Sequence, residues 1–210
     1  MTLALTPRTL SDLVPIPAAR TRQHARTVAL VTGFALLTAA LAQWKITLGF
    51  TPVPITGQTL GVLLAGASLG SVKGAASQAL YWAMGLVGLP FYSGGDGGWK
   101  SGTGTTMGYL VGFIVAAALV GLLAERRQDR SFLSSIPAML LGSMIIYVFG
   151  VTWLAHDLHV GVANSNPDVL GGETGLSLGM TPFLIGDALK VLVAGSLTPL
   201  AWRFASRRDG

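Results

Sequence analysis

The chain has 210 residues, of which 51% are hydrophobic and only 11% are charged, and its formal net charge is +5. Soluble domains carry about 25% charged residues, so this composition indicates a membrane protein. The basic residues flank apolar segments and do not form a patch, which argues against binding of nucleic acid. The sequence contains no cysteine, which excludes disulfides and thiolate metal sites.

The apolar segments, taken in chain order, predict six membrane-spanning helices. A span needs about 20 mostly apolar residues, and the second and third candidates are short and rich in glycine. We therefore expect an all-α integral membrane protein with one bundle of six transmembrane helices over residues 28–204, between an N-terminal tail (1–27) and a C-terminal tail (205–210). The predicted spans are residues 28–48, 55–70, 72–89, 107–124, 134–154 and 180–204.

The distribution of basic residues predicts that both ends of the chain are cytoplasmic. With the N-terminus inside, only Lys45, at the outer end of the first predicted span, and Lys100 fall on the outside, and Lys190 lies within a span. This bias follows the positive-inside rule and indicates a multi-pass membrane protein. We expect it in a cell membrane of the prokaryotic type. The other eleven of the fourteen basic residues are then cytoplasmic: Arg8, Arg20, Arg22, Arg26, Lys73, Arg126, Arg127, Arg130, Arg203, Arg207 and Arg208.

An acid and a base lie inside the last predicted span. Asp187 and Lys190 are three residues apart, so both project from one face of the helix. Charges inside a span cost about 2.5–3.5 kcal/mol each on insertion scales, so we expect them to face the bundle interior or a water-filled cavity. Three interpretations are open: a structural salt bridge, a proton or ion path, and a ligand site in which Lys190 binds an anionic group and Asp187 accepts hydrogen bonds. The position beneath two glycine-rich outer loops favours the ligand site.

Two other pairs occupy single helix faces. Gln78 and Tyr81 share a side of the third predicted span, either as ligand contacts or as an interhelical hydrogen bond and a packing aromatic. Ala35 and Ala39 form Ala-x-x-x-Ala on the first predicted span, which suits close packing within the bundle or docking of another membrane subunit.

Two outer loops combine turn residues with groups that could cover a ligand. Residues 51–59 contain Pro54, which stiffens the backbone, and Thr56 and Gln58, which supply hydrogen-bonding groups at the outer mouth. Residues 90–105 combine several glycines with the aromatic Phe91 and Tyr92. A glycine-rich backbone folds closely over a neighbour, although a plain flexible loop has the same composition.

The sequence lacks the motifs of the common membrane enzymes. It contains no Walker A motif, no H-E-x-x-H and no G-x-S-x-G, so we expect no ATPase, protease or lipase activity and classify the chain as no enzyme. His156 and His159 lie where an apolar segment ends, and they are too weak a cluster to predict a metal site.

Four segments in their order along the chain resemble the BioY family. They are "PVPITGQTLGVLLAGASLG" (52–70), "GLVGLPFYSGGDGG" (85–98), "MGYLVGF" (107–113) and "GDALK" (186–190). The resemblance covers residues 29–204. It implies a biotin-binding S component of an energy-coupling factor (ECF) transporter, with six membrane helices, a pocket near the outer face, and no cofactor besides biotin as the transported ligand. The implied partners are a transmembrane coupling subunit and two cytoplasmic ABC ATPases.

The resemblance also assigns roles to the candidate residues. Asp187 is expected to accept an N–H of the biotin ureido ring, and Lys190 to bind the carboxylate or another polar end of the ligand. Ala35 and Ala39 match the docking motif for the coupling subunit. The expected ligand contacts are Asp187, Lys190, Gln78, Tyr81, Phe91, Tyr92, Gly94 and Gly95, and the lid residues are Pro54, Thr56 and Gln58.

The sequence departs from the family pattern before the fourth predicted span. The family reads Pro-Thr-Gly-Gly-Tyr there, whereas this chain reads Thr-Thr-Met-Gly-Tyr over residues 105–109. The outer loop before the sixth span is also long. Two alternative functions stay open: an S component for another vitamin, and an ion- or proton-conducting membrane protein that uses Asp187 and Lys190.

Overall fold

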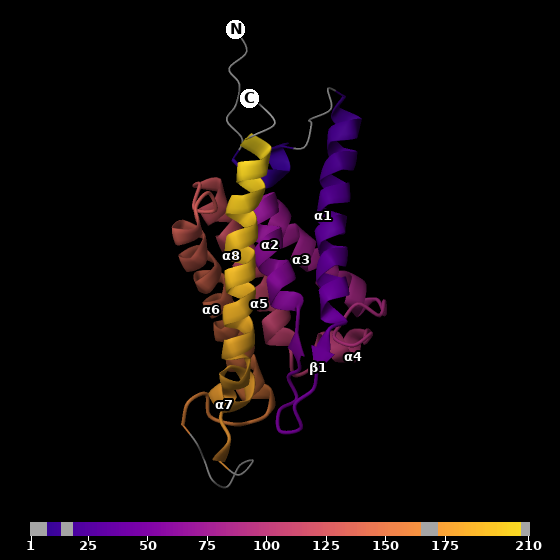
Figure 1. Cartoon of the computed structure of the whole chain (residues 1–210). Helices are drawn as coiled ribbons and strands as arrows, with labels where there is room; N and C mark the ends of the chain where they lie inside the picture. The colour runs from indigo at the N-terminus through magenta and orange to yellow at the C-terminus, as the bar shows by residue number, and fades with distance from the viewer. Residues whose placement is uncertain (1–7, 14–18, 165–171, 207–210) are drawn as a thin grey trace.

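The computed structural model describes residues 8–13, 19–164 and 172–206, and almost all of its regular structure is helical. Figure 1 shows the start of α1 and the end of α8 at one end of the bundle, and α4, α7 and β1 at the other. The elements are η1 (Leu10–Leu13), α1 (Arg20–Ala42), β1 (Lys45–Ile46), β2 (Ile55–Thr56), α2 (Gln58–Leu69), α3 (Ser71–Leu86), α4 (Trp99–Gly102), α5 (Met107–Glu125), α6 (Phe132–Asp157), α7 (Gly175–Gly179), η3 (Thr181–Phe183) and α8 (Leu184–Ser206).

The predicted helical membrane protein is confirmed. In the described ranges, four helical stretches are long and apolar enough to cross a membrane: α1, α5, α6 and the stretch Gly175–Ala205 that contains α8. The helices α2 and α3 have only 12 and 16 residues. At 1.5 Å per residue, α2 is about 18 Å long, which is shorter than the roughly 30 Å hydrocarbon core.

The predicted first span differs from α1 at both ends. α1 begins at Arg20, because Arg, Gln, His and Ala continue a helix that hydropathy alone does not detect. It ends at Ala42, and the chain then forms β1, which pairs with β2 in an antiparallel hairpin. The strand β1 has only two residues, Lys45 and Ile46, which is too short for composition to reveal this hairpin.

Glycines let α2, α3 and α5 approach one another closely. A Cβ on Gly66 would lie 2.6 Å from the Ala117 carbonyl oxygen, and a Cβ on Gly74 would lie 3.0 Å from Gly66 Cα. A Cβ on Gly121 would lie 2.3 Å from the carbonyl carbon of Gly70, where φ of +84° turns the chain from α2 into α3. Small residues at such contacts are typical of packing between membrane helices.

The helix α8 has an apolar outer face and a partly polar inner face. This arrangement reverses the pattern of a soluble helix and suits a lipid environment. Its large exposed apolar residues are Leu184, Ile185, Leu189, Leu192, Val193, Leu197, Leu200 and Phe204, and its inner face holds Asp187, Val191, Ala194, Thr198 and Trp202.

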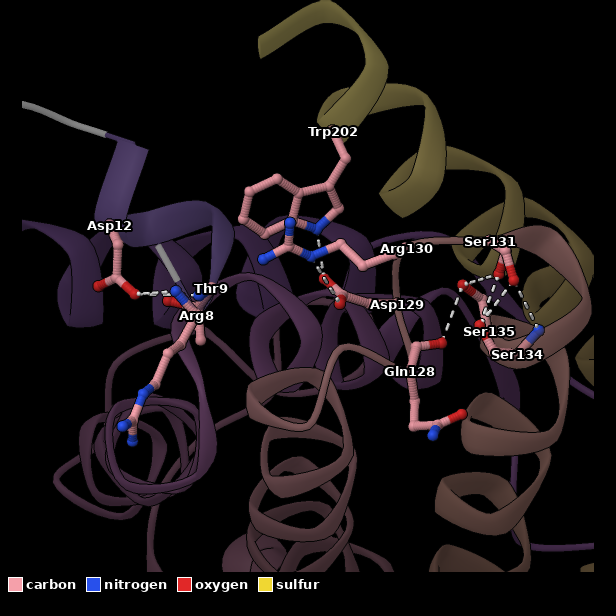
Figure 2. A network of polar contacts seen from close by, with 10 residues as sticks. All are labelled: Arg8, Thr9, Asp12, Gln128, Asp129, Arg130, Ser131, Ser134, Ser135 and Trp202. Atoms are coloured by element: carbon pink, nitrogen blue, oxygen red, sulfur yellow. Dashed lines mark hydrogen bonds and ion pairs between the residues drawn. The ribbon is translucent and has the colours of Figure 1, made fainter. Parts of the chain in front are cut away.

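The end of α8 is fixed to the loop between α5 and α6 (Figure 2). Trp202 Nε1 donates to Asp129 Oδ2 at 2.6 Å, and the Arg130 guanidinium lies 3.4 Å from the centroid of the Trp202 ring. Asp129 is only 2% exposed, and this desolvation raises the pKa of its carboxyl although the Trp202 bond lowers it. The cluster therefore joins α5, α6 and α8 at the end of the bundle opposite α7.

Candidate functional site

A cavity of about 200 Å³ lies at the end of the bundle where α8 begins. The hairpin β1–β2 and the start of α2 form one side of it, and α5, α6 and α8 form another. The loop before α4 adds Tyr92, Ser93 and Asp96. Its apolar wall comes from Val53, Leu110, Phe113, Ile146 and Phe183. A small cavity with apolar walls and a few polar groups is the usual form of a small-molecule site.

The carboxylate of Asp187 is the centre of the polar groups in this cavity. Lys190 Nζ lies 2.6 Å from Asp187 Oδ1, and Thr59 Oγ1 donates to the same oxygen at 3.1 Å. The hydroxyl of Tyr147 donates to Oδ2. Asp187 is 7% exposed, and donors from α2, α6 and α8 surround it. This pairing stabilises a charge that would be costly if it were buried alone.

A second series of hydrogen bonds joins β2 and the start of α2 to α3. Thr56 Oγ1 donates to Gln58 Oε1 at 2.6 Å, and Gln58 Nε2 donates to the Tyr81 hydroxyl at 2.6 Å. The Tyr81 ring packs edge-on against Tyr92, with 5.9 Å between the centroids. Thr56 and Gln58 are thus held from the bundle side, and their role as lid residues stays a prediction.

The glycine-rich loop of residues 87–98 packs against the ends of α1 and α3. Gly94 N donates to the Ala42 carbonyl at 3.2 Å, and the Tyr92 hydroxyl donates to the Trp82 carbonyl at 2.7 Å. Burial raises the pKa of Tyr92 to about 12, so its hydroxyl remains a donor at neutral pH. The loop of residues 87–98 therefore closes one side of the cavity through its own backbone contacts.

The structure brings six of the predicted site residues to the cavity lining. These are Pro54, Thr56, Gln58, Tyr92, Asp187 and Lys190. Five others lie outside the lining in the described ranges: Gln78, Tyr81, Phe91, Gly94 and Gly95. Their roles as ligand contacts stay predictions.

Gln78 has an unusual environment among these five residues. It is fully buried on α3, and its Nε2 donates to Ser77 Oγ at 3.1 Å. Its Oε1 has no hydrogen-bond partner among the described residues.

Ala35 and Ala39 face the interior of the bundle. Their exposed fractions are 0% and 5%, and both belong to the same buried apolar cluster as Tyr81 and Phe113. Packing on this face is close, because a Cβ on Gly61 of α2 would lie 2.9 Å from Thr38 Oγ1. The docking role of the two alanines stays a prediction, and any test of it must allow for their burial.

The polar lining residues that sequence reasoning missed include Lys45, Ser93, Tyr109 and Tyr147. Tyr147 could have been found, because a hydroxyl inside an apolar span needs a partner. Lys45 could not have been found from the sequence, because only the hairpin β1–β2 brings it to the cavity. The Tyr109 hydroxyl donates to the Gly179 carbonyl at 2.6 Å, and this bond fixes α7 to α5.

Comparison with known proteins agrees with this architecture. The profile of the BioY family matches residues 14–207. The biotin transporter BioY of Rhodobacter capsulatus is 41% identical over 175 residues, which cover 81% of this chain and 90% of the relative. The biotin transporter BioY of Rhizobium etli is 37% identical over 183 residues, which cover 82% of this chain and 90% of the relative. The crystal structure of the S-component for biotin from an ECF-type ABC transporter has the same fold, with a TM-score of 0.75, 24% identity, and coverage of 89% of this chain and 95% of the other.

Proposed function

The chain belongs to the BioY family, and on this premise we propose that it is the substrate-binding S component of an ECF-type importer for biotin. The family that the sequence predicted is thereby confirmed. A protein of this family is a transporter component and not an enzyme. Its site needs to hold one small molecule and release it unchanged, so it needs no reactive group.

The observation that carries the proposal is the buried carboxylate of Asp187 in the cavity, where it is bonded to donors from three helices. Biotin combines a ureido ring with two N–H donors and a carbonyl, an apolar thioether ring, and a chain that ends in a carboxylate. A ureido N–H donates to Asp187, and the apolar thioether ring packs on Phe113 and Ile146. Lys190 lies beside the same carboxylate and has further N–H donors for the ureido carbonyl, while Tyr147 donates its single hydroxyl proton to Asp187.

The membrane arrangement that supports this role has six spans, with both chain ends in the cytoplasm. Two facts support it: six helices of the described ranges have 12 or more residues, and eleven of the fourteen basic residues fall on the predicted inner side. The start of α1 and the end of α8 lie at one end of the bundle, and β1 and α7 lie at the other (Figure 1). The cavity is at this second end, because Lys45 of β1 and Asp187 near the start of α8 line it. In this orientation the cavity opens toward the outside of the cell membrane, where the vitamin is captured.

Release of the ligand to the inside requires partners. We infer a transmembrane coupling subunit and two cytoplasmic ABC ATPases, because this chain carries no nucleotide-binding motif of its own. The crystal structure with the same fold is that of an S-component from an ECF-type ABC transporter.

Equilibrium binding of labelled biotin to the detergent-purified protein tests the proposal. Saturable binding of biotin, with no competition from unrelated vitamins, is expected. Binding of a different vitamin in place of biotin would show that the protein is the S component for that vitamin. Ion flux into vesicles that needs Asp187 but not biotin would instead favour a conducting protein.

A further inference from the structure

Lys45 stands at the mouth of the cavity in a fixed position. It is the first residue of β1, and its Cα partner in the hairpin is Thr56 on β2. Both residues line the cavity, and Lys45 itself is exposed to solvent. Thr56 is held in turn by Gln58, which is bonded to Tyr81. The hairpin therefore places an ammonium group where the cavity meets the outside.

The side chain of Lys45 lies along the backbone of the glycine-rich loop. A Cβ on Gly94 would lie 2.8 Å from Lys45 Cδ and 3.4 Å from Lys45 Nζ. Gly94 has φ of +73°, which a residue with a Cβ rarely adopts. The absence of a side chain at this position thus leaves room for the lysine stem, and the loop directs the ammonium along the cavity entrance.

The charges around the cavity leave Lys45 without an acidic partner. Lys190 is already paired with Asp187 at 2.6 Å, and the ion pairs found in the described part of the chain do not include Lys45. Asp96 also lines the cavity, but its two oxygens accept hydrogen bonds from Gly97 N and Ser101 Oγ, both at 2.9 Å. Lys45 can therefore receive a ligand carboxylate without breaking an ion pair, whereas a carboxylate next to Lys190 would compete with Asp187 for the same ammonium.

A neighbouring hydroxyl supports the same position. Ser93 lines the cavity and precedes Gly94, over which the lysine stem lies. Its Oγ is buried and has no hydrogen-bond partner among the residues that the structure describes. A buried hydroxyl without a partner costs free energy, and an acceptor supplied by the ligand would remove that cost.

We propose that Lys45 and Ser93 bind the carboxylate of the ligand at the mouth of the cavity, while its ureido ring lies inside against Asp187. This inference rests on the proposed function and fixes the orientation of the ligand within it. It replaces the expectation that Lys190 binds the carboxylate, and it makes Lys45 a residue that selects for a negatively charged tail.

A comparison of biotin with its uncharged methyl ester tests the orientation. The wild type should bind the ester roughly tenfold more weakly than biotin. Lys45→Ala should weaken biotin binding by a similar factor and leave ester binding unchanged, and Ser93→Ala should do the same to a smaller extent. Lys45→Arg should restore most of the biotin affinity, because it keeps the charge. Added salt should reduce the preference for biotin over the ester in the wild type but not in Lys45→Ala.

Matched controls separate this inference from the proposed function. Lys100 is an exposed lysine of α4 outside the cavity lining, and Lys100→Ala should bind both ligands like the wild type. Lys190→Ala should weaken both ligands alike. Equal losses for the two ligands in Lys45→Ala, or no loss for either, would overturn the orientation, while the proposed function would stand because the wild type binds biotin. A folded wild type that binds neither ligand would overturn the proposed function as well.

Discussion

The hydroxyl of Tyr147 on α6 donates to Oδ2 of Asp187 on α8, while Lys190 Nζ lies 2.6 Å from Oδ1. Both oxygens of this buried carboxylate are thus oriented before any ligand arrives. Because the donors come from different helices, the position of the acid depends on the packing of the bundle. A ligand N–H meets an acceptor whose direction is already set, which reduces the entropy cost of binding.

Replacement of Tyr147 by phenylalanine should weaken biotin binding by roughly tenfold. The ring stays in place, but the carboxylate loses a donor that orients it, and bonds to charged groups contribute about 1.5–3 kcal/mol. Equilibrium binding measures the loss, and the thermal unfolding midpoint checks that the bundle remains folded. In an Asp187→Asn background the same replacement should cost much less, because the two residues act through one contact. Additive losses would show that Tyr147 acts independently of Asp187.

Removal of either charge of the buried pair should weaken biotin binding about ten- to a hundredfold. Asp187→Asn loses the charged acceptor, and Lys190→Ala leaves the carboxylate without its ion partner. Titrations of the two single variants and the double variant give the coupling between them. The double variant should lose less than the sum of the single losses. Unchanged affinity in both single variants would return the pair to a purely structural salt bridge.

The sequence predicted the helical membrane fold because long apolar segments and the basic loops leave few alternatives. It also located Asp187 and Lys190, because a charge inside a span needs a functional or structural reason. It did not predict the short hairpin β1–β2, whose two-residue strands leave no periodic pattern. For that reason the place of Lys45 beside Thr56 could not be known before the structure.

The same limit explains the alanines of α1. Ala-x-x-x-Ala indicates a face where another helix approaches, but the pattern does not say whether that helix belongs to the same chain. In the structure, Ala35 and Ala39 lie against the chain's own apolar cluster. A periodic pattern thus predicts contact, and only the tertiary arrangement identifies the partner.

We therefore expect Ala35→Leu to lower the thermal stability of the protein, in addition to any effect on docking of the coupling subunit. Ala35 is fully buried, and added methyl groups in a packed interior cost about 1–3 kcal/mol. Gly33→Leu is the matched control on the same helix, because a Cβ on Gly33 meets nothing within 4 Å. Thermal unfolding, biotin binding and co-purification with the coupling subunit measure the three effects. An Ala35→Leu protein that is stable and binds biotin, yet fails to co-purify, would support a direct docking role for Ala35.

Gly121→Ala should destabilise the bundle, although alanine favours a helix more than glycine does. Its Cβ would lie 2.3 Å from the Gly70 carbonyl carbon and 2.4 Å from Ser71 N, so α5 would have to move away from the turn between α2 and α3. We expect a loss of about 1–3 kcal/mol, which exceeds the roughly 1 kcal/mol gained from helix propensity. Gly33→Ala should show only the gain in stability from helix propensity. Equal unfolding midpoints for the two variants would contradict close packing at Gly121.

The buried Asp129 should make stability depend on pH in a defined direction. Desolvation raises the pKa of its carboxyl above the unfolded value, although the Trp202 bond opposes this shift. The folded state therefore holds the proton more tightly than the unfolded state does. The stabilising contribution of this group is complete below the unfolded pKa of about 4, and it is lost as the pH rises through the raised pKa.

Asp129→Asn isolates this effect, because the amide oxygen can still accept the Trp202 N–H but does not titrate. The free energy of unfolding of the wild type, minus that of the variant, should fall from acidic to neutral pH and then stay constant. Trp202→Phe removes the donor that favours the charged form, so the fall should extend to higher pH in that background. Thermal unfolding of the detergent-purified proteins across this pH range gives the difference. A difference that rises with pH would mean that Arg130, 3.8 Å from Asp129, outweighs the desolvation.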